Sequence, residues 1–260
     1  MAAHVEKPGI FDAHLHIIDP RFPLVANQGY VPAPFPCERY LEHARRLGIT
    51  GGAVVSGSFQ AFDQGYLKEA LARLGRGFVG VTQLPPTVTD AELRRLDRAG
   101  VRALRFNLRR GGSAGLADLD RLARRVHATV GWHAELYVDS AALDEVTATL
   151  VGLPAVSVDH LGLSRAGLPT LLRLVERGVR VKATGFGRID MDPVEALQAI
   201  HAVDPGALMF GTDLPSTRAP RPFRDADVDL IRDALGDAGA RRVLGDNARA
   251  FYRLEAGERG

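Results

Sequence analysis

The chain has 260 residues, a formal net charge of +2 at pH 7 and a single cysteine. One cysteine excludes an internal disulfide and any cysteine-based zinc or iron–sulfur site. With 46% hydrophobic and 25% charged residues, the composition is that of an ordinary folded chain. The near balance of charge gives no support to a nucleic-acid-binding protein.

The amino terminus, MAAHVEKPGI, lacks the apolar segment of a signal peptide. The longest apolar runs have the length of a strand, far below the ~20 residues that cross a bilayer. The lone Cys37 suits a reducing compartment. These features predict a cytoplasmic protein with no membrane partner, and they leave open whether the chain forms an oligomer.

Short apolar runs alternate along the chain with amphipathic runs rich in Ala, Leu and Arg. We predict strands over residues 9–17, 50–57, 78–84, 101–108, 132–138, 155–162, 179–186 and 207–214. Helical runs follow the strands, for example from residues 91, 116, 168 and 193. Gly100 and Gly178 stand where a glycine would end a helix just before the next strand.

Eight strand–helix units in about 250 residues predict an α/β fold of the (β/α)8, or TIM, barrel type. A doubly wound open sheet is the alternative, but its first turn is usually rich in glycine, and the first predicted strand here ends in histidine. We expect one domain over residues 1–254 and a flexible tail over 255–260. The proline-rich stretch 18–36 is expected to lie over the barrel mouth.

In such a barrel the active site lies at the carboxyl ends of the strands. The first predicted strand ends in His14 and His16, which alternation places on one inward face, with Asp12 one layer deeper. The eighth ends at Asp213, and the first and last strands are neighbours in a closed barrel. We therefore expect His14, His16 and Asp213 to converge, as ligands of a divalent metal or as a general base with two imidazoles. Core histidines and a turn-forming aspartate are the alternative interpretation.

Other strand ends carry further polar residues. His160 ends the sixth strand, and Asp159 before it is expected to face outward. On the fifth strand Tyr137 should reach the mouth, whereas Glu135 lies a layer deeper, which leaves no obvious metal ligand there. Four arginines stand on or after the fourth, seventh and eighth predicted strands: Arg105, Arg109, Arg188 and Arg218. Their guanidinium groups can bind carboxylates in a bidentate manner, which suits an anionic substrate. Solvent-exposed surface arginines are the alternative interpretation.

Seven segments, in chain order, carry a resemblance: FDAHLHIID, GVRALRFN, GWHAELYVD, VSVDHLG, VKATGFGR, MFGTDLPS and GDNARAFY. They resemble the amidohydrolase superfamily and, within it, the amidohydrolase-2 branch that holds 2-pyrone-4,6-dicarboxylate hydrolase and related lactonases. The resemblance covers nearly the whole chain. It implies a (β/α)8 barrel that hydrolyses a lactone, an amide or a related carbonyl compound.

The resemblance also implies roles. Asp213 matches the general base on water, and the histidines match those around the scissile carbonyl: His14, His16 and His160. Arg105 and Arg188 match binders of substrate carboxylates. Tyr137 and Ser58 match further substrate contacts.

The chain also departs from the branch. Gln60 stands where the pyrone hydrolases have a histidine, and Arg218 where they have an asparagine. The second arginine of the fourth strand is either Arg109 or Arg110. These departures leave the substrate open.

The cofactor is open as well, because the branch includes members thought to work without a metal. A zinc ion on His14, His16 and Asp213 and a metal-free site are both retained. Two other functions stay possible at this point: a metal-dependent decarboxylase of the same superfamily, which needs a metal ligand from the fifth strand, and a non-catalytic small-molecule-binding barrel.

Overall fold

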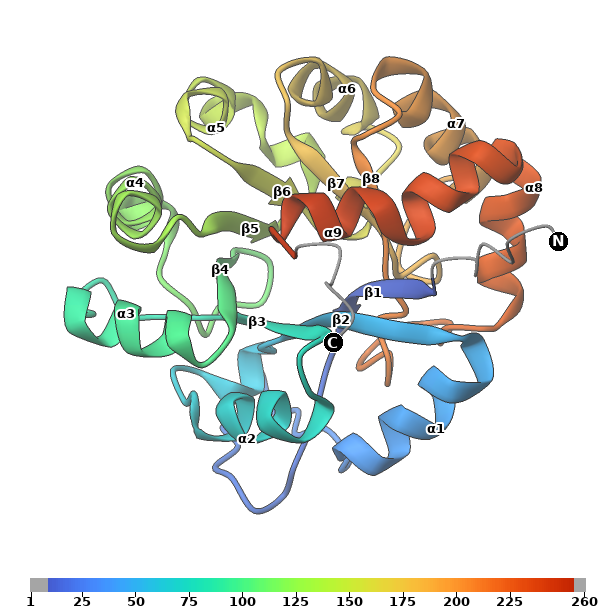
Figure 1. Ribbon diagram of the computed structural model, residues 1–260. Helices are drawn as coiled ribbons and strands as arrows, with labels where there is room; N and C mark the ends of the chain where they lie inside the picture. Colours follow the sequence, from blue (N-terminus) through green and yellow to red (C-terminus); the bar gives the residue numbers. More distant parts are fainter. Residues whose placement is uncertain (1–8, 255–260) are drawn as a thin grey trace, which may run out of the picture.

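The computed structural model describes residues 9–254, and eight parallel strands, each paired with the next along the chain, form its centre (Figure 1). The strands are β1 (Ile10–Leu15), β2 (Ile49–Val55), β3 (Phe78–Thr82), β4 (Val101–Asn107), β5 (His133–Tyr137), β6 (Val156–Val158), β7 (Arg180–Ala183) and β8 (Leu208–Phe210). The predicted (β/α)8 barrel and its eight strands are confirmed. Every strand ends earlier than predicted, so several site residues stand on turns just beyond the strands.

Helices surround the strands (Figure 1). They are α1 (Cys37–Leu47), α2 (Gly65–Leu74), α3 (Asp90–Arg98), α4 (Leu119–Val130), α5 (Thr147–Gly152), α6 (Leu168–Glu176), α7 (Pro193–Val203), α8 (Ala226–Arg241) and α9 (Asn247–Phe251). The Thr89 hydroxyl caps α3 by accepting from the amide of Glu92 at 3.2 Å. Gly100 and Gly178 follow α3 and α6 with φ of 97° and 92°, as expected of glycines that end helices.

The core has two layers. The larger lies between strands and helices, and the smaller fills the barrel interior with side chains such as Phe11 and Val81. Helix α9 crosses the end of the barrel that faces the viewer in Figure 1, and Tyr252 just after it is buried in the inner layer. His133 packs against Phe251 and Tyr252, with ring centroids 4.2 and 5.0 Å away. This contact confirms that His133 lies low in the barrel, away from the mouth.

The segment after β8 closes the barrel against β1. The Asp213 amide donates to the His14 carbonyl at 2.7 Å, and the His16 amide donates to the Leu214 carbonyl at 2.8 Å. Gly211 permits this approach, because a Cβ there would lie 2.7 Å from the His14 Cβ. The backbone that closes the barrel is therefore the backbone that carries Asp213 to the two histidines.

Strand β1 is irregular, and this changes the position of Asp12. Its pairing register with β2 shifts between Asp12 and Leu15. The Asp12 carboxylate accepts from the Tyr40 hydroxyl of α1 at 3.1 Å and from the Thr212 amide at 2.8 Å. The prediction that Asp12 shares the inward face of His14 is therefore wrong, because the shift breaks the two-residue alternation. Burial raises the pKa of Asp12 to about 6.

The stretch 18–36 runs from β1 to α1 and contains two isolated bridges, Ile18 with Phe35 and Asn27 with Tyr30. It reaches the carboxyl-terminal face of the barrel, where the Val25 amide donates to the Phe59 carbonyl at 2.8 Å. The predicted tail, residues 255–260, lies outside the described residues. Within 9–254, no helix combines the length and the apolar character needed to cross a membrane.

Candidate active site

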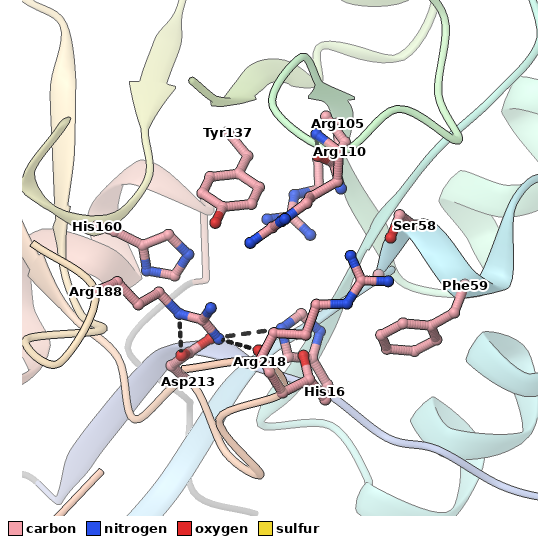
Figure 2. Close-up of a pocket in the computed structure, with 13 residues that line it drawn as sticks. His16, Ser58, Phe59, Arg105, Arg110, Tyr137, His160, Arg188, Asp213 and Arg218 are labelled. Atoms are coloured by element: carbon pink, nitrogen blue, oxygen red, sulfur yellow. Dashed lines mark hydrogen bonds and ion pairs between the residues drawn. The ribbon is translucent and has the colours of Figure 1, made fainter. Parts of the chain in front are cut away.

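A pocket opens at the carboxyl ends of the strands. Figure 2 shows aromatic, imidazole and guanidinium groups from separate strand ends pointing into it. Its lining comprises His16, Gly57, Ser58, Phe59, Arg105, Asn107, Arg110, Tyr137, His160, Arg188, Asp213, Thr217 and Arg218. Most of the predicted site residues therefore meet in one place, and His14 lies directly below them.

The expected convergence of His14, His16 and Asp213 is observed. Asp213 Oδ1 lies 3.9 Å from His14 Nε2 and 3.6 Å from His16 Nε2. His160 joins them, with its ring centroid 4.9 Å from that of His14. All four side chains are almost completely buried. Two polypeptide ends that are about 200 residues apart thus form one cluster.

Several atoms of this cluster have no hydrogen-bond partner among residues 9–254. His16 Nδ1 lies 2.8 Å from the Val55 carbonyl oxygen, which can only accept, so Nδ1 carries a proton and Nε2 points toward Asp213. Within the same residues, His14 Nε2, His160 Nδ1 and Asp213 Oδ1 are buried without a partner. Unpartnered polar atoms in a buried site are unfavourable unless a water or a cation lies between them.

The donor set fits a divalent metal ion. Two ligands, each about 2.1 Å from the same ion, can be at most about 4.2 Å apart. The distances from Asp213 Oδ1 to His14 and His16 are both shorter than this limit. The group at this position whose ligand atoms all lie within 4.8 Å of one another is His14, His160 and Asp213, whereas the predicted set with His16 in place of His160 does not meet that limit. The chain therefore has groups that can hold a metal at this position.

Arg188 holds the other oxygen of Asp213. Its Nε donates to Asp213 Oδ2 at 2.7 Å, and its Nη2 donates to the Thr217 carbonyl at 2.7 Å. Burial alone would raise the pKa of Asp213, but the Arg188 guanidinium and the His16 ring outweigh it and hold the pKa well below its usual value. Asp213 is thus ionised at neutral pH and is a weak base.

A second set of charges lies deeper, on the Nδ1 side of His14. Arg105 Nη2 donates to Asp159 Oδ2 at 2.7 Å, and Lys182 Nζ donates to Glu135 Oε2 at 2.5 Å. Lys182 Nζ is also 3.4 Å from His14 Nδ1. We call Arg105, Glu135, Asp159 and Lys182 the deep charge cluster; its two cations and two carboxylates balance.

Two members of the deep charge cluster depart from the sequence analysis. Asp159 was expected to face outward, and this is wrong: β6 ends at Val158, so strand alternation no longer fixes the direction of the next side chain. Lys182 was missed altogether. The available signal was a lysine between Val181 and Ala183 in a short apolar strand, where an unpaired ammonium would be costly.

Glu135 lies deep, as expected, on the Nδ1 side of His14 together with Asp159. Its carboxylate contacts Lys182 and lies 3.8 Å from His14 Nδ1, the ring nitrogen that points away from Asp213. Burial, and next the charge of Asp159, raise the pKa of Glu135 to about 7. Strand β5 therefore contributes no ligand on the Asp213 side of His14.

The structure places the two candidate arginines after the fourth strand, Arg109 and Arg110, in different surroundings. Strand β4 ends at Asn107, and the Asn107 side chain accepts from the Arg110 amide at 3.0 Å in a tight turn. Arg110 then lines the pocket, whereas Arg109 is exposed and does not. The alternation that grouped Arg105, Asn107 and Arg109 fails because it was extended beyond the end of the strand.

The remaining predicted residues have distinct surroundings. Tyr137 lies between His160, 5.0 Å away between centroids, and the Arg105 guanidinium, 5.5 Å from the tyrosine ring. Ser58 lines the pocket. Gln60 is structural, because it donates to the Ile17 carbonyl at 2.8 Å and accepts from the Gly57 amide at 2.7 Å.

Comparison with known proteins agrees with this geometry. A 4-sulfomuconolactone hydrolase of Rhizobium radiobacter is 29% identical over 269 residues, which cover 94% of this chain and 90% of that protein. A 2-pyrone-4,6-dicarboxylate hydrolase of Comamonas testosteroni is 31% identical over 159 residues, or 59% of this chain and 52% of that protein. The apo structure of ATU3138 from Agrobacterium tumefaciens has the same fold, with a TM-score of 0.84, 24% identity and coverage of 95% and 96%.

The family description "Amidohydrolase" matches residues 11–254. This range contains all of β1 but its first residue, His14 and His16, the other seven strands and the segment that carries Asp213. The match covers far more than half of the chain, so the chain belongs to the amidohydrolase family and is an amidohydrolase-type hydrolase.

Proposed function

We propose that this protein hydrolyses a lactone, or a related cyclic ester, of a small anionic substrate. The observation that carries the proposal is the ionised Asp213, whose free oxygen faces His14 and His16 at the base of an arginine-lined pocket. Two relatives with 29% and 31% identity are lactone hydrolases, which supports the same reaction type here.

Asp213 is the base in this proposal. Its Oδ2 is held by Arg188, and its Oδ1 is free to accept a proton from a water that attacks the carbonyl carbon. His160 lines the same pocket, and burial lowers its pKa to about 4. A neutral imidazole retains one N–H, which can donate to the carbonyl oxygen as negative charge develops there.

A metal ion is part of the proposal, and zinc suits a set of two imidazoles and a carboxylate. His14 and Asp213 would hold it, with a second imidazole from His16 or His160. Such an ion would lower the pKa of a bound water and polarise the carbonyl. That chemistry would compensate for the weak basicity that Arg188 imposes on Asp213.

The charges of the pocket support an anionic substrate. Four arginines and one carboxylate line it, and Arg105 and Arg188 already contact Asp159 and Asp213. Arg110 and Arg218 remain as positive charge at the mouth. A carboxylate or sulfonate would be attracted there and would orient the ring toward Asp213, which lowers the entropic part of the barrier.

Hydrolysis is better supported than decarboxylation. The decarboxylase alternative needs a metal ligand from β5, and the candidate, Glu135, is bound to Lys182 on the far side of His14. A cytoplasmic location also belongs to the proposal, and it is supported by the single cysteine, Cys37, whose thiol is buried and free.

The test is a screen of lactones that carry no, one or two carboxylate or sulfonate groups, with products followed by mass. We expect the anionic lactones to gain one water, and no loss of carbon dioxide. Asp213→Asn should lower kcat by about 10²- to 10⁴-fold, because the variant cannot take the proton. The matched control is Asp233→Asn, an exposed acid on α8. Turnover of neutral lactones alone, or an active Asp213→Asn variant, would refute the proposal.

The metal is tested separately. Protein prepared without chelator is assayed before and after chelation, and then with zinc added back. Loss and zinc-dependent recovery of activity is the expected result. Full activity after chelation, with no metal detected in the protein, would remove zinc from the proposal and leave hydrolysis in place.

A further inference from the structure

The segment that carries His160 into the pocket has an unusual backbone. Residues 160–163 begin two residues after the end of β6, and all four have a positive φ, between 50° and 72°, although three of them are not glycine. Residues other than glycine rarely adopt such angles, and segments that do so persist only where their surroundings hold them. We call residues 160–163 the left-handed turn.

The left-handed turn is most strained at Leu163, where φ is 70° and ψ is −47°. The Ser164 amide donates to the Gly162 carbonyl at 2.9 Å and closes a three-residue turn around Leu163. This is a γ-turn with positive φ, which is rare in proteins because it is strained. The position of the Gly162 carbonyl therefore decides whether the turn stays closed.

A buried hydroxyl from the neighbouring loop fixes that carbonyl. Ser140, in the loop after β5, is fully buried, and its Oγ donates to the Gly162 carbonyl oxygen at 2.8 Å. The chain packs closely around this hydroxyl, because a Cβ on Gly162 would lie 2.7 Å from Ser140 Oγ and one on Gly167 would lie 2.1 Å from it. Beside it, Ser164 Oγ donates to Asp139 Oδ1 at 2.5 Å. Two hydroxyl groups thus tie the loop after β5 to the left-handed turn.

The left-handed turn sets the direction of the His160 ring. His160 has φ of 53°, and its carbonyl accepts from the Leu163 amide at 2.9 Å, which joins it directly to the γ-turn. Its ring lies in a narrow gap, 5.0 Å from the Tyr137 ring between centroids, and its Nδ1 would be 2.5 Å from a Cβ on Gly185. A return of this backbone to negative φ would move the ring out of the gap.

We propose that Ser140 is a positioning residue for the hydrolysis: its hydroxyl holds the left-handed turn and so keeps the His160 ring aimed at the carbonyl of the substrate. Ser140 lies outside the pocket lining, so it acts through His160 and not on the substrate. This inference rests on the proposed function, in which the neutral His160 ring donates to the developing negative charge. It adds that the loop after β5 controls that donor.

A double-mutant cycle tests whether Ser140 acts through His160. Ser140→Ala should lower kcat by about 10-fold and change KM by less than about 2-fold, because the His160 hydrogen bond strengthens only as charge develops. In a His160→Gln background, Ser140→Ala should change kcat by less than about 2-fold. Thr147→Ala is the matched control and should keep the wild-type kcat, because its hydroxyl donates at 2.9 Å to the Leu143 carbonyl, within the loop after β5 rather than to the turn.

The NMR signals of isotope-labelled histidine rings give a readout that needs no turnover. The His160 signal, identified by its loss in His160→Gln, should shift or broaden in Ser140→Ala. The signal of His133, low in the barrel, should stay in place. If Ser140→Ala does not fold, Ser164→Ala removes the second hydroxyl tie and replaces it in both measurements.

The outcomes separate this inference from the proposed function. In an active enzyme, an unchanged kcat or an unchanged His160 signal in Ser140→Ala overturns the role of Ser140. An equal loss of kcat in the wild-type and His160→Gln backgrounds overturns it as well, because Ser140 would then act through the general structure. Failure of every lactone to react, with the His160 signal still dependent on Ser140, refutes the lactonase and leaves Ser140 as the residue that directs the His160 ring.

Discussion

The deep charge cluster and the two arginines at the pocket mouth, Arg110 and Arg218, use the same kinds of side chain in opposite ways. In the deep cluster Arg105 and Lys182 are matched by Asp159 and Glu135, and each cation donates a short hydrogen bond to a carboxylate. At the mouth, the Arg218 guanidinium is held by Asn27 and the Tyr30 ring, and the Arg110 guanidinium lies 3.5 Å from the Gln28 side-chain oxygen. The deep charges are paired with one another, although Arg105 Nε, Glu135 Oε1 and Asp159 Oδ1 have no hydrogen-bond partner among residues 9–254, whereas the mouth charges have no carboxylate within ion-pair distance in that range.

His14 connects the deep charge cluster to Asp213. Its Nδ1 faces Lys182 and Asp159 at 3.4 and 3.5 Å, and its Nε2 faces Asp213 at 3.9 Å. The deep cluster thus fixes the ring that serves the reaction, in the way that a second layer of hydrogen bonds orients ligands and catalytic groups. The comparison teaches that cations paired with carboxylates inside the fold position other groups. Cations without a carboxylate partner are instead candidates for binding a ligand.

The largest expected effect on stability comes from breaking the deep cluster. Lys182→Met leaves Glu135 buried without its cation and should lower the free energy of unfolding by about 3–5 kcal/mol. The combined variant Lys182→Met with Glu135→Leu should recover most of this loss, because both charges are then gone. Urea unfolding measures all three proteins.

The control for Lys182→Met is Arg232→Met, which removes a cation from the exposed pair with Asp229 on α8 and should leave stability nearly constant. If Lys182→Met were as stable as the wild-type protein, the deep cluster would not differ from a surface ion pair, and the comparison would fail.

Lowering the pH should have an intermediate effect on the free energy of unfolding. Burial lowers the pKa of His160 from 6.5 in the unfolded chain to about 4 in the folded protein. The His160 ring is neutral in both the folded and the unfolded protein above pH 6.5. As the pH falls from 6.5 toward 4, the ring takes up a proton in the unfolded chain first, so the free energy of unfolding falls. This group alone should cost about 2 kcal/mol between pH 7 and pH 4.5.

The measurement compares wild-type protein with His160→Gln at both pH values, since His14 and His133 also have pKa values lowered by burial and are common to the two proteins. The variant should lose about 2 kcal/mol less than the wild-type protein on acidification. An equal loss would mean that His160 is not the buried neutral ring that the site requires.

The smallest effect on the free energy of unfolding should come from a substitution of an arginine at the pocket mouth. Arg110→Gln removes a charge that repels Arg218, so it should leave the free energy of unfolding constant or raise it by up to about 0.5 kcal/mol. Any gain should disappear at 1 M salt, which screens the repulsion. A clear loss of stability at low salt would show that Arg110 is paired as the deep arginine is, and the distinction between the two regions would disappear.

The sequence by itself determined the barrel and the general position of the site. Eight apolar runs that alternate with amphipathic ones specify strands and helices, and the carboxyl ends of the strands must share one face of a closed barrel. His14, His16, His160 and Asp213 could therefore be predicted to meet, because each stands at the end of a strand or within three residues after it. Tyr137 could be placed at the mouth for the same reason.

The tertiary structure alone decided what happens where regular backbone ends. Alternation gave the wrong direction for Asp12, Asp159 and Arg109, because a register shift or a strand end lies at or just before each of them. The pairing of Lys182 with Glu135 and the contact of Asn27 with Arg218 join residues 47 and 191 positions apart. Local sequence patterns show which residues are apolar and how often they recur. They do not show which charged side chains contact one another across the barrel. Those contacts distinguish the positioning residues from the binding residues here.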